Sequence, residues 1–568
     1  MTGGARVPAR LDPAALLARA TADLAKGRLH RAAELVGAAL NAGPAPALAA
    51  QLRLVRAGAW FQAGQLDKAE LECRRALAGP VDGTASAAHA HLMVARCLLQ
   101  RGAGAEAVTA TESAFARGAD GASAWQTYAR ALSLERRHRA AIQAAWTAHG
   151  RAPPHEPAVR RTLIDVLVSA GEHGEAIRFI EAELPSQAAD AALWTSLGLS
   201  HDALGHSEAA VAALRQAISL DPGRADANCG LGMALLRLGD LPQGFRHNEH
   251  RQKDAGAGWR FGAPPWRGQP LDRAHLLVLA EQGFGDTIQF SRFVPMVGRR
   301  AAQVTFLVPP ALVRLLSGAA TAGRFALASG HPGFGTADVQ TLVMSLPHWL
   351  GPASAFGAGA LPWLRPEPDR VLRWRAALPA GPTIAISWQG NPQYAGEPWR
   401  SIPLSRLEPL FALTRQRVTW LSLQKHFGRE QLAASPAAGQ LIDLADRIDG
   451  AGDAFVDSLA ILSLVDLFIT TDSALAHLAG SAGIPTWVLL SHPADWRWGT
   501  SGETTAWYPA LRLFRQARGG DWNGVIAEVG EALGAFLACP RRDQLARHSG
   551  SKSAAECATP PQVVGAGA

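Results

Sequence analysis

The sequence predicts an all-α helical repeat array followed by an α/β region with two lobes, each built on a parallel sheet. Three observations lead to this fold class. The first half of the chain repeats with a period of roughly 34 residues, which is typical of tetratricopeptide-like helix pairs, and has apolar residues at helical spacing. A stretch rich in Gly and Pro at 254–270 interrupts that period. After it, short apolar runs alternate with helical segments, which is typical of parallel sheets covered by helices.

Each repeat has a turn position and a small residue five positions later. The turns recur at nearly constant intervals, at Gly27, Gly64, Gly102, Arg136, Gly171, Gly205 and Gly239. The small residues, which let paired helices approach closely, are Ala32, Ala69, Ala107, Ala141, Ala176, Ala210 and Gly244. Residues 192–222 (ALWTSLGLSHDALGHSEAAVAALRQAISLDP) resemble the tetratricopeptide consensus. The resemblance implies a superhelix whose concave face receives a polypeptide.

The changes of pattern set the predicted domain borders. We expect a tetratricopeptide superhelix over 1–253, a linker over 254–270, a first lobe over 271–380 and a second lobe over 381–538. Residues 539–568 are rich in Ala, Gly, Pro and Ser without periodicity, which predicts a disordered tail. Strand-like runs begin at 275, 303, 325 and 338 in the first lobe, and at 383, 418, 466, 485 and 511 in the second. We expect the functional site in the cleft between the lobes.

The composition argues against several classes of protein. Hydrophobic residues make up 48% and charged residues 18%, and no apolar run approaches the roughly 20 residues of a membrane span. The N-terminus lacks the apolar core of a secretory signal, so we expect a cytoplasmic protein. Five scattered cysteines without a Cys-x-x-Cys pair predict reduced thiols and no zinc site. A net charge of +7 without a basic block argues against nucleic acid as a partner.

The segment 281–287 (EQGFGDT) follows the first strand-like run and begins a helix. Gly283 and Gly285 allow the backbone to approach a ligand, and the helix N-terminus offers N–H groups to an anion. The longer run EQGFGDTIQFSRFVPMV resembles a segment of tetratricopeptide-linked glycosyltransferases related to the ADP-heptose transferases, a family 9-like group. That resemblance implies a GT-B domain, with two Rossmann-like lobes, and Asp286 as general base. The alternative is that Asp286 only caps its helix.

A second segment, 470–480 (TTDSALAHLAG), also leads from a buried strand into a helix. It resembles the family segment in which Asp and Ser or Thr precede a helix that carries His. The resemblance implies that Asp472, Ser473 and His477 bind the donor's phosphates or sugar at the helix N-terminus. Asp472 as an N-cap and His477 as a structural residue are the alternatives.

The third segment, WQGNP at 388–392 followed by RSIPL at 400–404, resembles a family element that approaches the donor. Trp388, Asn391 and Arg400 are its candidate donor-binding residues. Relatives have a basic residue in the intervening stretch, whereas here 393–399 reads QYAGEPW. This departure leaves Arg400 to supply the charge, or indicates a different donor or a lost activity.

Two further stretches extend the resemblance. Gln424 and Lys425 follow a strand end and are expected near the nucleotide. The other stretch is aromatic, and we interpret its rings as packing beneath a loop, with stacking on a base as the alternative; they are Trp496, Trp498, Trp507 and Tyr508.

Taken together, the resemblance implies a metal-independent inverting glycosyltransferase that uses a nucleotide-sugar and no cofactor. By similarity to other repeat-bearing glycosyltransferases, its acceptor is a protein held on the concave face, with flagellin as one guess. The alternative is a non-catalytic repeat scaffold with a degenerate GT-B domain, which the altered 393–399 stretch favours. Hydrolysis is set aside because neither a nucleophile elbow nor a P-loop motif is present.

Overall fold

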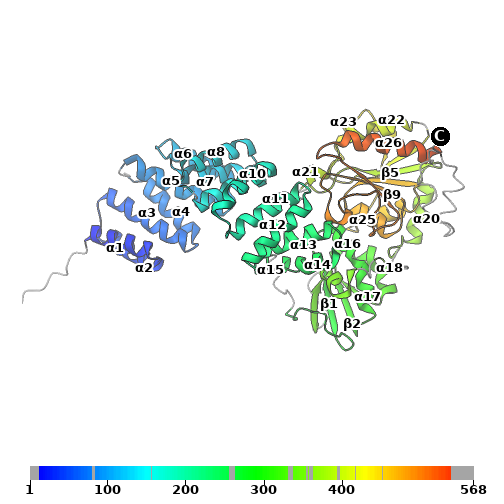
Figure 1. Cartoon of the computed structure of the whole chain (residues 1–568), viewed down its shortest axis with the longest axis horizontal. Helices are drawn as coiled ribbons and strands as arrows, with labels where there is room; N and C mark the ends of the chain where they lie inside the picture. Colours follow the sequence, from blue (N-terminus) through cyan, green and yellow to red (C-terminus); the bar gives the residue numbers. More distant parts are fainter. Residues whose placement is uncertain are drawn as a thin grey trace, which may run out of the picture. The chain divides into compact units, whose positions relative to one another are not determined.

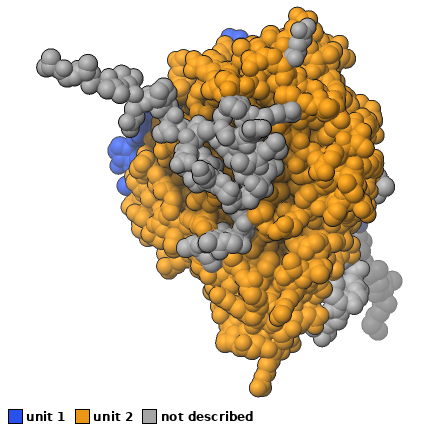
Figure 2. Space-filling view, turned by 90° about the vertical axis from the view of Figure 1, so that its right-hand side faces the viewer, with its two compact units in different colours: residues 1–188 blue, residues 189–568 orange. Residues whose placement is uncertain are grey.

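A computed structural model of the chain describes residues 12–538 apart from 80–82, 155, 255–261, 330–336, 353–355, 357–361, 393–396, 416 and 451. The predicted tail and part of the predicted linker therefore lie outside the described residues. The chain divides into two compact units, residues 1–188 and residues 189–568 (Figure 2). This division falls inside the repeat region, so the last helix pairs belong to the same unit as the sheets.

Unit 1 consists of helix pairs in which each helix contacts its partner, and the first helices of successive pairs also contact one another (Figure 1). The turns between paired helices use left-handed backbone, with φ of 70° at Gly27 and 56° at Arg136. The predicted small residues are fully buried where paired helices meet, as at Ala107 and Ala176. The helices are α1 (Pro13–Ala25), α2 (Leu29–Asn41), α3 (Pro46–Gln62), α4 (Leu66–Leu77), α5 (Gly83–Gln100), α6 (Gly104–Phe115), α7 (Ala122–Leu134), α8 (His138–Arg151), α9 (Pro157–Ser169) and α10 (His173–Glu183).

Unit 2 begins with two further helix pairs, α11 (Ala191–Ala203) with α12 (Ser207–Leu220) and α13 (Ala225–Arg237) with α14 (Leu241–Asn248), followed by α15 (Arg251–Asp254). Gly244 is required in α14, because a Cβ there would lie 2.5 Å from the Leu236 side chain. Leu236 and Phe245 belong to the hydrophobic core that also contains Phe290 and Trp496. The last helix pair is therefore packed into the core of the α/β region.

The first lobe contains a four-stranded parallel sheet in the order β3-β2-β1-β4. Its strands are β1 (His275–Leu279), β2 (Gln303–Leu307), β3 (Ala326–Ala328) and β4 (Val339–Leu342), and its main helices are α16 (Phe284–Phe290), α17 (Val294–Gly298) and α18 (Val313–Gly323). The helix α19 (Leu346–Leu350) contacts α14 of the repeats.

The second lobe contains a six-stranded parallel sheet in the order β10-β9-β8-β5-β6-β7. The helices α22 and α26 pack together on one face of this sheet, and α25 lies on the other (Figure 1). The strands are β5 (Thr383–Ser387), β6 (Thr419–Ser422), β7 (Leu441–Asp443), β8 (Leu467–Thr471), β9 (Thr486–Leu490) and β10 (Leu511–Arg515). The helices are α20 (Pro368–Ala377), α21 (Glu397–Arg400), α22 (Leu404–Leu413), α23 (Gln431–Ala434), α24 (Val456–Leu462), α25 (Ala474–Ser481) and α26 (Trp522–Ala538).

The structure confirms the predicted helical repeats and the predicted parallel α/β region. The short strand β7 was missing from the prediction, since Leu441–Asp443 is too short to give a periodic signal. The cysteines within the described residues, Cys73, Cys97 and Cys229, are free thiols. In the part of the chain that the structure describes, no helix is both long and apolar enough to cross a bilayer.

Candidate functional site

A cavity of about 910 Å³ in unit 2 collects segments from both lobes. Its walls include the segments that follow β1, β5, β6 and β8, the segment around Phe455, residues 495–497, and side chains of the last repeats. In the second sheet the strand order reverses between β5 and β8, and doubly wound sheets bind ligands at such a reversal, beyond the carboxyl ends of the strands. The cavity lies at that position and has the size of a small-molecule site.

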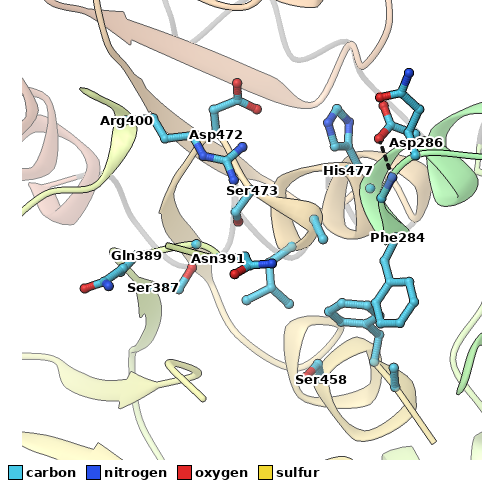
Figure 3. Close-up of a pocket in the computed structure, with 18 of the residues that line it drawn as sticks. Phe284, Asp286, Ser387, Gln389, Asn391, Arg400, Ser458, Asp472, Ser473 and His477 are labelled. Carbon is cyan, nitrogen blue, oxygen red and sulfur yellow. Dashed lines mark hydrogen bonds between the residues drawn. The ribbon is translucent and has the colours of Figure 1, made fainter. Parts of the chain in front are cut away.

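Most of the predicted site residues line this cavity, although they come from distant parts of the sequence (Figure 3). The exception is Trp388, whose indole is fully buried in the core and donates to the carbonyl of Gly428 (3.2 Å), so this side chain packs and does not face a ligand. The predicted residues in the cavity wall are Gly283, Gly285, Asp286, Asn391, Arg400, Gln424, Lys425, Asp472, Ser473 and His477.

Asp286 caps helix α16 and also takes part in an ion pair. Its Oδ2 accepts a hydrogen bond from the backbone N–H of Gly283 (2.9 Å; Figure 3), and its Oδ1 accepts one from the Arg497 guanidinium. The side chain of Asp286 is 21% exposed and that of Arg497 is 9% exposed. Asp286 therefore caps α16, and its carboxylate also borders the cavity.

Arg497 is a site residue that the sequence analysis missed. Its guanidinium also binds Asp495 Oδ1 (2.9 Å) and Gln289 Oε1 (2.5 Å). Although burial opposes its charge, the carboxylates of Asp495 and Asp286 raise the pKa of Arg497. Burial likewise opposes the charge of Asp495, but Arg497 holds the pKa of that carboxyl below its usual value. The pattern Asp-x-Arg within HPADWRWG was the available signal, but it lies among aromatics that we treated as packing.

A row of alternating charges connects this ion pair to the repeats. Arg237 of α13 donates to the carboxylate of Asp202 and to its carbonyl oxygen (3.1 Å). Arg237 and Asp202 both interact electrostatically with Asp495, which binds Arg497. The row therefore runs Asp202, Arg237, Asp495, Arg497, Asp286, from α11 to the first lobe. The segment Trp496–Trp498 also contacts α13 directly.

His477 is a buried, neutral side chain. Its Nδ1 is hydrogen bonded to the Tyr508 hydroxyl (3.0 Å), and its ring stacks on Trp498 at a centroid distance of 5.5 Å. Burial, and next the charge of Arg497, lower the pKa of His477 to about 3, while burial raises the pKa of Tyr508 to about 12. Gly285 is needed beside it, because a Cβ there would lie 2.9 Å from His477 Cδ2.

Asp472, Ser473 and Arg400 lie together in one wall of the cavity. Figure 3 shows the guanidinium of Arg400 beside Asp472 and Ser473. Burial, and next the charge of Asp495, raise the pKa of Asp472 to about 6, which Arg400 opposes. Ser473 is the N-cap residue of α25 in extended conformation, and its hydroxyl lies 3.3 Å from that of Thr470. This wall combines an arginine, a helix N-terminus and a carboxyl whose pKa is raised to about 6.

Gln424 and Lys425 are held by backbone groups. The Gln424 amide binds the backbone N–H of Trp388 (2.8 Å) and the carbonyls of Gln389 (2.8 Å) and Phe427 (2.6 Å). Lys425 Nζ donates to the carbonyls of Ile448 (2.7 Å) and Asp449 (2.7 Å). Both side chains therefore fix the loops of the cavity wall.

Aromatic rings have two roles around the cavity. The exposed ring of Phe284 meets Phe455 of the second lobe edge to face, with centroids 6.0 Å apart, and both line the cavity. The sequence analysis did not identify this apolar wall. The rings predicted to pack beneath a loop are all buried, which confirms that interpretation for Trp496, Trp498, Trp507 and Tyr508.

Within the described ranges, no cluster of three or more His, Cys, Asp or Glu side chains is arranged to hold a metal ion.

Comparison with known proteins identifies the repeats. Residues 17–83 and 195–244 match the tetratricopeptide repeat family, so the N-terminal region carries these repeats and they continue into unit 2. Over 464 residues the chain is 25% identical to Protein FlbA of Caulobacter vibrioides, which covers 70% of this chain and 76% of FlbA.

Solved structures of repeat proteins are also similar to this chain. A tetratricopeptide repeat protein from Parabacteroides merdae is 15% identical, with 44% of this chain and 94% of that chain covered and a TM-score of 0.37. YrrB, described as a TPR protein with an unusual peptide-binding site, is 14% identical, with 30% and 87% covered and a TM-score of 0.25. The repeats indicate a protein-interaction scaffold.

Proposed function

We propose that this chain is a GT-B glycosyltransferase that transfers a sugar from a nucleotide-sugar to a polypeptide acceptor. One observation carries the proposal: motif residues from segments near 285, 391, 400 and 473 line a single cavity at the reversal of strand order. That position and those chemical groups suit an anionic ligand between two lobes. A cytoplasmic location agrees with a nucleotide-sugar substrate.

The donor's diphosphate would lie against Arg400 and the first turn of α25. Arginine binds phosphate through two parallel hydrogen bonds, and the free N–H groups at a helix N-terminus favour negative charge. Neutral His477, held by Tyr508, offers one ring nitrogen for a hydrogen bond without adding charge. These groups would stabilise the nucleoside diphosphate as it leaves, so that no metal or cofactor is needed.

Asp286 would act as the general base. In this step the carboxylate accepts the proton of an acceptor hydroxyl, the hydroxyl oxygen bonds to the anomeric carbon, and the bond from that carbon to the diphosphate breaks. A single displacement of this kind inverts the anomeric configuration. Arg497 would keep the carboxylate oriented and charged before the proton arrives.

The acceptor would be a protein held by the repeats, and flagellin remains one candidate. Met233 of α13 and Asn248 of α14 line the same cavity as Asp286. A segment bound along the last helix pair would therefore reach the candidate base without leaving unit 2.

The second candidate is a scaffold with a degenerate GT-B domain. It is favoured by the ion pair between Asp286 and Arg497, which occupies the carboxylate in the absence of substrate, and by the lack of a basic residue at 393–399. In that case the lobes would assemble with partners and bind no donor.

Thermal shift measurements with a panel of nucleoside diphosphates separate the two candidates. A ligand of the folded state raises the melting temperature by mass action, so the transferase predicts a concentration-dependent rise with at least one nucleotide. Arg400→Gln should reduce that rise, whereas Arg406→Gln, on the neighbouring helix α22 and outside the cavity, should leave it unchanged. No response to any nucleotide would favour the scaffold. Intact-mass analysis of acceptors co-expressed with the chain then tests transfer itself.

A further inference from the structure

A second, smaller cavity lies in unit 1, far along the sequence from the site in unit 2. It measures about 250 Å³ and is lined by the first helices of three consecutive pairs, α3, α5 and α7. These first helices contact one another and form one face of the array. The volume is below the usual range of small-molecule pockets, so it suits a side chain more closely than a nucleotide-sugar. The lining residues are Phe61, Arg96, Leu99, Gln100, Gln126, Thr127 and Arg130.

Two arginines occupy equivalent positions of successive repeats in this cavity. Arg96 and Arg130 are separated by one repeat period. Burial, and next the charge of Arg130, lower the pKa of Arg96, so the two guanidinium groups repel each other. The pKa of His89, on the same helix, is lowered first by burial and second by the charge of Arg96.

No carboxylate of the described residues forms a salt bridge with either arginine. The Arg96 guanidinium donates to the neutral hydroxyl of Ser123. The carboxylate of Asp165 forms its ion pair with Arg161 (3.4 Å). Against the larger effect of burial, which raises the pKa of Asp165, Arg130 also lowers that pKa, but more weakly than Arg161 and without a salt bridge. Arg96 is partly buried and Arg130 is exposed, so burial beside a like charge costs free energy mainly at Arg96 unless an anion accompanies it.

Other arginines on the same helices are neutralised within the chain. On α3, Arg53 and Arg56 both lie within salt-bridge distance of Glu72, at 3.4 Å and 2.7 Å. Among the described residues, therefore, the arginines of α3 have a carboxylate within salt-bridge distance and the two arginines of the cavity do not.

The rest of the cavity is mixed, with polar side chains at Gln100, Gln126 and Thr127 and apolar ones at Phe61 and Leu99. Phe61 and Leu99 are partly buried side chains packed against the core that runs from the second to the fifth helix pair. An occupant would therefore meet a positive end between the arginines and an apolar surface beside them.

We propose that this cavity binds an acidic segment of a partner protein, with an Asp or Glu carboxylate between Arg96 and Arg130 and a neighbouring apolar side chain against Phe61 and Leu99. A carboxylate accepts two parallel hydrogen bonds from an arginine, and between two arginines it removes their repulsion. The inference adds the chemical class of the partner to the proposed function. It rests on that function only for its biological role, because the binding needs no nucleotide.

Fluorescence anisotropy with the full chain tests the inference. The probes are three labelled peptides of identical length, Ser-Leu-X-Leu-X-Leu-Ser, in which X is Asp, Asn or Lys. The Asp peptide should bind at least about tenfold more tightly than the Asn peptide, since hydrogen bonds to charged groups contribute that much, and the Lys peptide should bind weakest. Equal affinities for the Asp and Asn peptides would overturn the proposal without the need for any variant.

Two variants then locate the binding. Arg96→Gln with Arg130→Gln should weaken the Asp peptide about tenfold or more while the Asn peptide is unaffected. Arg139→Gln removes the same charge from the exposed side of α8 and should leave affinity unchanged. Unchanged binding in the double variant, or an equal loss in the control, would mean that the cavity is not the site. Nucleotide-induced thermal shift in the same samples reports on the proposed transferase separately.

Discussion

The guanidinium of Arg497 donates to the carboxylate of Asp286, and this ion pair joins the two lobes of the α/β region. The same guanidinium is bound by Asp495, so one buried arginine serves two carboxylates. The orientation of Asp286 therefore depends on a loop of the second lobe, far along the chain. This dependence changes what substitution of Asp286 is expected to do.

Asp286→Asn should lower turnover by about 10² to 10⁴ at saturating donor, because an amide cannot accept the hydroxyl proton. The variant should also be less stable by about 1 to 3 kcal/mol, since a charged hydrogen bond is lost and an amide N–H faces the guanidinium. Sugar transfer to a verified acceptor and denaturant unfolding measure the two effects. Near-normal turnover would exclude Asp286 as the base.

Asp495→Asn is the matched control for that experiment. It removes the other carboxylate of Arg497, at 2.9 Å, and keeps the candidate base. Stability should fall by a similar amount, about 1 to 3 kcal/mol, while turnover should fall much less than in Asp286→Asn. If both variants lost turnover equally, the ion-pair network and not proton transfer would explain the loss.

The sequence predicted the fold well because its signals are local. The repeat period, the alternation of strands and helices and the glycine turns are set by neighbouring residues, and the structure contains each of them. Asp286 and His477 both line the cavity because each lies in the first turns of a helix that follows a buried strand. Parallel strands bring such positions to one edge of a sheet.

Side-chain direction and long-range pairing could not be read in this way. Trp388 and Gln424 also follow strand ends, but one points into the core and the other binds the adjacent loop. Arg497 lies in an aromatic stretch, and its importance depends on Asp286 in the other lobe. No local pattern records that contact.

Arg237→Gln tests whether the last repeats support the site. Arg237 is 10% exposed, and its loss leaves Asp202 without its partner, so unfolding free energy should fall by about 3 to 5 kcal/mol. Because Arg237 lowers the pKa of Asp495, its removal should raise that pKa and weaken the hold on Arg497. Turnover should therefore fall in a folded variant although residue 237 lies in a repeat. Arg215→Gln, which is exposed on α12, should change neither property.

Gly285→Ala tests the close packing of α16 against α25. The added Cβ would lie 2.9 Å from His477 Cδ2 and 3.4 Å from Ala474 Cα, so the ring or the helix has to move. Overpacking of this kind costs about 1 to 3 kcal/mol, and it should weaken nucleotide binding by displacing the first turn of α25. Calorimetric titration with the nucleotide identified by thermal shift measures the effect. Gly439→Ala, where no atom lies within 4 Å of the new Cβ, should behave like the native chain.

The charge of Asp472 should make both stability and donor binding depend on pH. Burial, and next the carboxylate of Asp495, raise its pKa from 3.8 to about 6, whereas Arg400 and Arg497 oppose that shift. Between these values the folded chain binds more protons than the unfolded chain, so this group's contribution to the unfolding free energy falls as pH rises from about 4 to about 6. Below pH 6 the neutral carboxyl no longer repels the donor's phosphates, so donor affinity should be higher there. His477, with a pKa of about 3, does not titrate in this range.

Asp472→Asn keeps the side chain neutral at every pH, so its unfolding free energy should lack this pH-dependent component. A nucleoside diphosphate used in place of the donor has a terminal phosphate that also titrates near pH 6. The ratio of native to variant affinity is therefore the quantity to measure, and it should decline from pH 5 to pH 7. A ratio that stays constant over that interval would show that Asp472 does not face the donor.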